Sequence, residues 1–73
     1  MSLGADRVRL TFNPSADNLV DKFKRLSADL IDLCEVQNKG PNTPTEQWRL
    51  YILAMDAYEE AAMWAVKAAT FTK

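Results

Sequence analysis

Residues 58–69 read YEEAAMWAVKAA, and this stretch decides the fold. Alanine, glutamate and methionine are strong helix formers, so the stretch predicts a helix. From Ala61 to Ala69 the only charged residue is Lys67, which makes the predicted helix apolar on nearly every side. A helix at the surface of a small protein normally has one apolar stripe and one polar face. This helix therefore needs to be covered on more than one side.

The residues just upstream mark where this helix begins. Thr43 suits an N-cap, Pro44 suits the first helical position, and Glu46 lies three residues after Thr43, as in a capping box. A Gly-Pro pair at residues 40–41 has the order expected after the end of a preceding helix. These signals predict a second helix over about residues 44–70.

A longer apolar pattern before the break predicts the first helix, over about residues 14–37. Asn13 suits its N-cap and Pro14 its first helical position. Large apolar residues recur in it at alternating steps of four and three: Leu19, Phe23, Leu26, Leu30 and Leu33. Ile31 and Cys34 widen this stripe. We expect it to be the seam along which the first helix packs.

The segment ahead of the first helix is expected to be extended. Residues 7–12 read RVRLTF and alternate polar with apolar side chains, as a short strand would. We therefore predict an extended arm over residues 7–13 and assign no role to residues 1–4. The predicted fold class is all-α: one helical-hairpin domain over residues 1–73, with two antiparallel helices behind the arm.

Two helices cannot enclose a core, and chains this small usually need covalent staples or partners. Cys34 is the only cysteine, so no disulfide can form within the chain. The second helix carries a ridge of small residues at helical spacing, which would let another backbone approach closely: Ala54, Ala57, Ala61, Ala65 and Ala68. We therefore predict that the hairpins assemble into a homo-oligomer.

Composition argues against several function classes. Nine Lys and Arg residues against ten Asp and Glu residues do not suit a general DNA- or RNA-binding protein, which needs a strongly basic surface. No apolar run approaches the ~20 residues that span a bilayer, and no signal-peptide core is seen, so we expect a cytoplasmic protein. The absence of histidine removes the commonest general base and metal ligand. We expect no catalytic residues, no metal and no cofactor.

Two carboxylate pairs have one-turn spacing: Asp32 with Glu35, and Asp56 with Glu59. Some all-α nucleotide pyrophosphohydrolases hold magnesium with such pairs, so this enzyme class is the alternative hypothesis. Folding about Gly40 would separate the pairs by about seven residues, or ~10 Å, along the hairpin, which is too far for one magnesium site. Surface ion pairs are the expected role instead: Asp32 with Arg49, Asp56 with Arg25, and Glu59 with Lys22.

Positive charges cluster in the first third of the chain. Five of the nine lie within 19 residues: Arg7, Arg9, Lys22, Lys24 and Arg25. Phe12 and Asn13 lie in the same region, so an aromatic face, an amide and several cations could bind a small anionic ligand that has a base and phosphates. Arg49, near the start of the second helix, is a further phosphate donor. From the residues alone, ordinary ion pairs and a purely structural oligomer remain alternatives.

Short motifs along the chain resemble those of a known phage family. The second helix contains three of them in order: Leu53-Ala54, Glu59-Glu60-Ala61 and Met63-Trp64-Ala65. They resemble the signature of a hairpin domain shared by anti-CBASS and anti-Thoeris cyclic-nucleotide sponges. The resemblance covers about residues 10–71 and includes further positions upstream: Phe12-Asn13-Pro14, Lys22, Lys24, Leu33-Cys34 and Arg49.

This resemblance implies a function. The family's members form compact hexamers without catalytic activity, and in the infected bacterial host they sequester the cyclic nucleotides that trigger antiphage defence. By resemblance, Phe12 stacks on a base and Lys24 binds phosphate in a cyclic dinucleotide pocket. Asn13 and Arg49 are candidates for a second pocket, for cyclic trinucleotides. The full set of candidate ligand-binding residues is Phe12, Asn13, Lys24, Arg49, Lys22 and Arg9.

The chain departs from the family's pattern at several positions. Asp56 stands where a threonine is common, Val66-Lys67 replaces a more usual Asn-Ala, and Phe12 lacks the hydroxyl of the tyrosine often found there. Residues 37–47 form a connector of this chain's own. A cyclic dinucleotide, a cyclic trinucleotide and an ADP-ribose-derived signal therefore all stay open as ligands.

Overall fold

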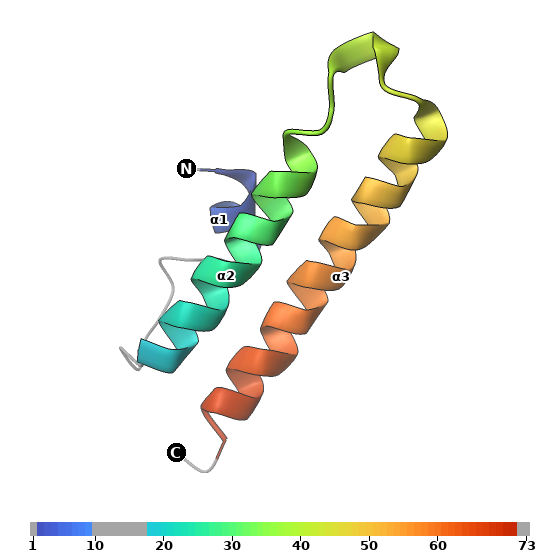
Figure 1. The fold of residues 1–73 in the computed structure, drawn as a ribbon. Helices are drawn as coiled ribbons and strands as arrows, with labels where there is room; N and C mark the ends of the chain where they lie inside the picture. Colours follow the sequence, from blue (N-terminus) through green and yellow to red (C-terminus); the bar gives the residue numbers. More distant parts are fainter. Residues whose placement is uncertain (1, 10–17, 72–73) are drawn as a thin grey trace.

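The computed structural model describes residues 2–9 and 18–71 of the chain, and these parts are helical with no strand. Its elements are α1 (Leu3–Arg7), α2 (Asn18–Glu35), the 3₁₀ turn η1 (Gly40–Asn42) and α3 (Thr45–Ala69). The long helices α2 and α3 run antiparallel, joined by the connector that contains η1, and α1 packs against α2 (Figure 1). The predicted all-α helical hairpin is confirmed for the described residues.

The N-terminal segment is helical rather than extended. Ser2 is the N-cap of α1, since its Oγ accepts a hydrogen bond of 3.0 Å from the backbone N–H of Ala5. The helix continues through Arg7, and Val8 is its C-cap. The predicted extended arm was therefore wrong for residues 7–9, because the cap signal at Ser2 outweighs the short alternation. Residues 10–17, which hold the rest of the arm and the predicted start of the first helix, lie outside the described residues.

The face of α2 that packs within the protomer is not the predicted leucine seam. We call the buried residues of α2 the inner face: Val20, Lys24, Ala28, Ile31 and Cys34. Four of the five predicted seam residues are exposed, and we call them the leucine stripe: Leu19, Leu26, Leu30 and Leu33. Consecutive helix residues point about 100° apart, so the two sets lie on neighbouring faces. The seam prediction was right for Ile31 and Cys34 but wrong for these four leucines, because the step pattern alone does not say which of two neighbouring faces meets α3.

Helix α3 contributes its own regular series to the core. The contributing residues follow each other at steps of three and four: Trp48, Tyr51, Met55, Tyr58 and Ala62. Met55 and Ala62 are buried, and the aromatic residues pack around them at partial exposure. Ile31 of the inner face is completely buried in this cluster. The hairpin is thus held by large α3 side chains that pack over small and medium residues of α2.

The start of α3 lacks the predicted capping box. Pro44 occupies the N-cap position and makes no side-chain capping bond. Thr43 is extended, as the residue before a proline prefers, and its Oγ1 accepts a bond of 2.6 Å from the N–H of Lys39. Glu46 pairs with Arg49 instead of reaching back to Thr43. The capping prediction was wrong because the proline turns Thr43 toward the connector, which it stabilises.

Candidate functional site

A pocket of about 430 Å³ lies where α1, α2 and α3 meet. This volume is within the range of about 300–1,000 Å³ that is typical of small-molecule sites. Among the described residues, its charged lining consists of four cations and one carboxylate: Arg7, Arg9, Lys24, Lys67 and Glu59. Apolar side chains of α3 and Val8 complete the wall. The excess of positive charge favours an anionic ligand that also has an apolar or aromatic part.

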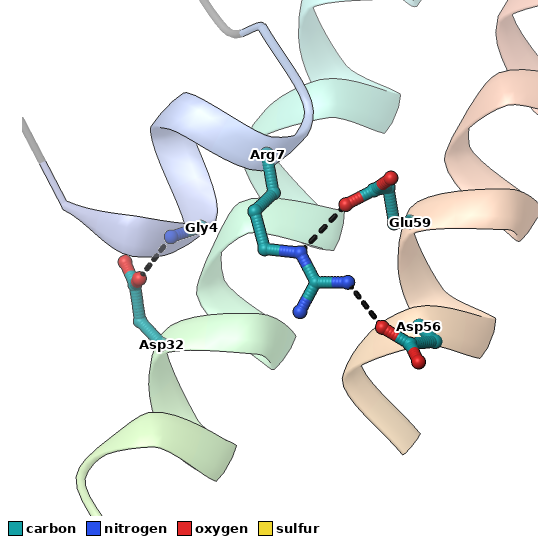
Figure 2. Close-up of polar contacts among 5 residues, drawn as sticks. All are labelled: Gly4, Arg7, Asp32, Asp56 and Glu59. Carbon is teal, nitrogen blue, oxygen red and sulfur yellow. Dashed lines mark hydrogen bonds and ion pairs between the residues drawn. The ribbon is translucent and has the colours of Figure 1, made fainter. Parts of the chain in front are cut away.

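Helix α1 is held against α2 at a single glycine. The backbone N–H of Gly4 donates a hydrogen bond of 2.6 Å to Oδ1 of Asp32 (Figure 2). A Cβ atom at Gly4 would clash with the carbonyl oxygen of Ala28, so the two helices approach as closely as their backbones allow. The expectation that residues 1–4 have no role was therefore wrong for Ser2 and Gly4.

Arg7 connects α1 to the opposite helix. Its Nε donates a hydrogen bond of 2.6 Å to Oε1 of Glu59, and its Nη2 donates one of 2.5 Å to Oδ1 of Asp56 (Figure 2). The bond to Glu59 is the main reason why the pKa of Arg7 is raised above its ordinary value, and Asp56 adds to it against the lowering effect of burial. The guanidinium therefore keeps its charge, and two carboxylates of α3 hold it in one place.

Lys24 is the buried cation of the pocket. It lies on the inner face of α2 with 6% of its surface exposed, and its Nζ donates a hydrogen bond of 3.1 Å to the carbonyl oxygen of Arg9. Burial lowers the pKa of Lys24, and the positive charge of Arg9 lowers it further, while Asp21 acts in the opposite direction. An incoming phosphate would offset both effects, because its negative charge favours the protonated form of the ammonium.

The structure brings together some of the predicted ligand-binding residues and separates others. Arg9 and Lys24 line the same pocket, whereas Lys22 is exposed on α2 and does not line it. Arg49 lies in the second turn of α3, where both its Nε and its Nη2 donate to Glu46, whereas the α3 residues that line the pocket lie between 59 and 67. The other two candidates, Phe12 and Asn13, lie outside the described residues.

Two charged residues of the pocket, Lys67 and Glu59, lie outside the cation cluster that the sequence indicated. Lys67 is the only charge between residues 61 and 69, and a lone cation on an apolar helix is a signal that could have identified it. Its Nζ lies 5.7 Å from the ring centroid of Trp64, within cation–π range. Glu59 was considered only as a metal ligand or surface partner, because its contact with Arg7 depends on a helix that the sequence did not predict.

The predicted surface ion pairs are wrong. Asp32 accepts a hydrogen bond from the backbone N–H of Gly4 instead of pairing with Arg49. Asp56 and Glu59 both form ion pairs with Arg7, and not with Arg25 and Lys22 as predicted. Arg25 and Arg49 instead pair within their own helices, with Asp21 and Glu46 at distances of 2.9 and 2.7 Å. Residues one turn apart on a helix are neighbours, so Arg25 and Arg49 reach these partners whatever the packing between helices.

Two further structural findings concern the described residues only. In residues 2–9 and 18–71 no three His, Cys, Asp or Glu side chains come together in a way that could hold a metal ion. Within the same ranges, no helix combines the length and the apolar character needed to cross a membrane.

The fold and the pocket define a small helical-hairpin protein with a site suited to an anionic small molecule. A family model described as Acb2/Tad1, hairpin domain, matches residues 4–70, and the chain belongs to this family of anti-CBASS and anti-Thoeris cyclic-nucleotide sponges. The resemblance noted in the sequence is thereby confirmed, and the match begins within α1. The family consists of sponge-type binding proteins rather than enzymes. No curated protein and no solved structure gives a significant match to the chain.

Proposed function

We propose that the protein is a non-enzymatic sponge that sequesters the cyclic oligonucleotide signals of CBASS-type defence in the cytoplasm of the infected bacterium. The observation that carries this proposal is the pocket, where four cations stand against one carboxylate, that of Glu59, in the part of the chain that the structure describes. A cyclic dinucleotide has two phosphates and two bases, so it needs cations and apolar surface in one place. Membership of the sponge family supports the same ligand class.

Lys24 is the proposed phosphate ligand of this pocket. Folding has already removed most of the water around its side chain, which is 6% exposed, so little desolvation is left for the binding step. Phe12 follows Arg9 by three residues in the sequence and is the proposed stacking partner of a base. Lys22, an exposed residue two positions before Lys24 on α2, is assigned only a long-range attraction for the ligand.

A second pocket for cyclic trinucleotides would draw on two copies of the chain. Asn13 follows Arg9 by four residues and Arg9 lines the pocket, whereas Arg49 lies near the connector. We assign Asn13 and Arg49 to this second pocket as contributions of different protomers.

The protomer also exposes the surface that such an assembly needs. The leucine stripe of α2 is exposed, and α3 exposes large apolar side chains of its own: Leu50, Leu53, Met63 and Trp64. Three members of the alanine ridge are exposed as well: Ala57, Ala61 and Ala68. Contiguous exposed apolar surface of this kind is typical of an interface. We assign it to a homohexamer, the assembly that the family resemblance implies.

The test is a calorimetric titration of the assembled protein with cyclic di-GMP, cyclic GMP–AMP, cyclic tri-AMP and a cyclic ADP-ribose, followed by recovery of each ligand. The expected result is tight binding of at least one cyclic dinucleotide, which is then recovered intact. Lys24→Ala should weaken that binding by about ten- to a hundredfold, since a hydrogen bond to a charged group is worth ~1.5–3 kcal/mol. Phe12→Ala should weaken it by a similar amount without changing its salt dependence.

Lys39→Ala is the matched control, because it removes an exposed lysine from the connector. Its affinity should equal that of the wild-type protein. Recovery of hydrolysed ligand with release of pyrophosphate would contradict the sponge function and support the pyrophosphohydrolase hypothesis. Absence of any binding would support the hypothesis of a purely structural assembly protein. Wild-type affinity in both Lys24→Ala and Phe12→Ala would contradict the assignment of the pocket.

A further inference from the structure

Helix α1 cannot be stable by itself. It has five residues, whereas isolated helices shorter than about 12–15 residues are marginal in water. Its position therefore depends on contacts with the rest of the chain. Gly4 binds Asp32 of α2, and Arg7 binds Asp56 and Glu59 of α3, so that α1 packs on α2 and reaches α3 through the Arg7 side chain (Figure 2).

The position of α1 against α2 is sterically constrained. Gly4 lies so close to Ala28 of α2 that no other residue fits there without a shift of the helix. Ala5 is buried, and Val8 belongs to the same buried cluster as Ile31. A displacement of α1 along or away from α2 would break these contacts together, so α1 has one well-defined docked position.

The C-terminal end of α1 forms one wall of the pocket. Arg9 has a left-handed backbone with φ of 56°, which residues other than glycine adopt only when their surroundings hold them. Its N–H donates a bond of 3.2 Å to the carbonyl of Asp6, which closes the helix end. Its own carbonyl accepts the bond from Nζ of Lys24. The direction of the Lys24 side chain thus depends on where α1 ends.

We infer that α1 is a positioning element of the ligand pocket: Arg7, held by Asp56 and Glu59, fixes the carbonyl of Arg9 and through it the ammonium of Lys24. This inference rests on the proposed function. Arg7, Asp56 and Glu59 then act through Lys24 and not by touching the ligand. The competing view is that Arg7, which also lines the pocket, binds a phosphate directly.

A variant that removes the two carboxylates but keeps Arg7 separates these views. In Asp56→Asn/Glu59→Gln the pocket loses the negative charge of Glu59, and Arg7 loses both of its carboxylate partners. Direct binding by Arg7 predicts equal or tighter affinity for cyclic di-GMP or cyclic GMP–AMP, because the guanidinium is released in a more positive pocket. Positioning predicts the opposite result, an affinity about tenfold weaker. The matched control is Glu46→Gln/Glu60→Gln, which removes two exposed carboxylates of the same helix that do not contact α1 and should not weaken binding.

A second readout does not use a ligand. The pKa of Lys24, measured by NMR on the assembled protein, should rise toward its ordinary value in Asp56→Asn/Glu59→Gln, because release of α1 exposes the ammonium and withdraws Arg9. Removal of two negative charges by itself would lower that pKa, so the sign of the shift distinguishes movement of α1 from a simple charge effect.

Two more variants complete the test. Arg7→Ala/Lys24→Ala should bind cyclic di-GMP no more weakly than Lys24→Ala, since Arg7 has nothing left to position, and Arg7→Lys should recover part of the affinity lost in Arg7→Ala. Wild-type affinity in Asp56→Asn/Glu59→Gln, or loss of its assembly by light scattering, would overturn the inference while the proposed function stands. Failure of the wild-type protein to bind either cyclic dinucleotide would overturn both.

Discussion

The two apolar faces of α2 differ in what they are made of and in what covers them. The inner face carries small and medium residues with one lysine, and α1 and α3 cover it within the protomer. The leucine stripe carries the larger and more regular side chains, and nothing in the described part of the chain buries it. The difference teaches that the most regular hydrophobic pattern of a small chain need not be the one that folds it.

Close approach explains why the inner face has small residues. At Ala28 the backbone of α2 meets Gly4 of α1, and a leucine in either place would push the helices apart. Lys24 belongs to this face because its end reaches the pocket rather than the core. The leucines are suited to a surface that several copies cover, which is the role proposed for them. Four predictions test this division of roles.

The largest effect is expected from Ile31 on the inner face. Ile31→Ala removes the one fully buried large side chain of the described residues and should lower the free energy of unfolding by about 2–5 kcal/mol. Leu33→Ala, at a side chain that is 60% exposed, should change the stability of the dissociated protomer by no more than ~0.5 kcal/mol. Urea unfolding at several protein concentrations measures both. Equal losses at the lowest concentration would remove the distinction between the two faces.

The second effect concerns assembly. Leu26→Glu places a charge in the leucine stripe, where the side chain is 64% exposed, so the protomer should keep its helical content. A charge buried at an interface without a partner is strongly unfavourable, so the mass should fall toward the 8.3 kDa of one chain. Sedimentation of Leu26→Glu beside Lys22→Glu, a new acidic charge on an exposed polar position of α2, checks this. An unchanged mass in Leu26→Glu would show that the stripe is not the interface.

The third effect depends on pH through Lys24. The pKa of Lys24 is lowered below the ordinary 10.5, so as the pH rises Lys24 loses its positive charge earlier than an exposed lysine would. Binding of cyclic di-GMP should therefore begin to weaken at a lower pH. Stability should move the other way: folding disfavours the protonated form, and this penalty is relieved as the pH rises through the window between the lowered pKa and 10.5. Titrations from about pH 7 to about pH 10 test the first point, and Lys24→Arg, which stays charged throughout, is the control. An equally steep loss of affinity in Lys24→Arg would exclude Lys24 as the titrating group.

The smallest effect is expected at Arg49. Its ion pair with Glu46 is exposed and one turn apart, so Arg49→Ala should leave the melting temperature unchanged. Affinity for a cyclic dinucleotide should also stay the same, because Arg49 does not line the pocket that contains Lys24. Only cyclic tri-AMP should bind more weakly, through the second pocket. A loss of cyclic dinucleotide affinity would mean that the two sites share a residue.

Local signals in the sequence determined the helical hairpin and its break. The Gly-Pro pair at residues 40–41 and Pro44 separate α2 from α3, and α3 starts and ends within a residue of the expected 44–70. These signals act over a few neighbouring residues, so they can be read without knowing the rest of the fold. The cation cluster that holds Arg9 and Lys24 was likewise visible as a feature of the chain.

Only the tertiary structure decided which faces meet and what each charge contacts. Ile31 and Leu30 are neighbours in the sequence, and both satisfy a helical apolar pattern, but only Ile31 is buried in the core cluster with α3 residues. The docking of α1 depends on Gly4 and Arg7 reaching partners 28 and about 50 residues away, which no local pattern encodes. Periodicity reports which residues share a face of one helix, whereas the choice among faces and the pairing of charges depend on how closely backbones from distant parts of the chain can approach.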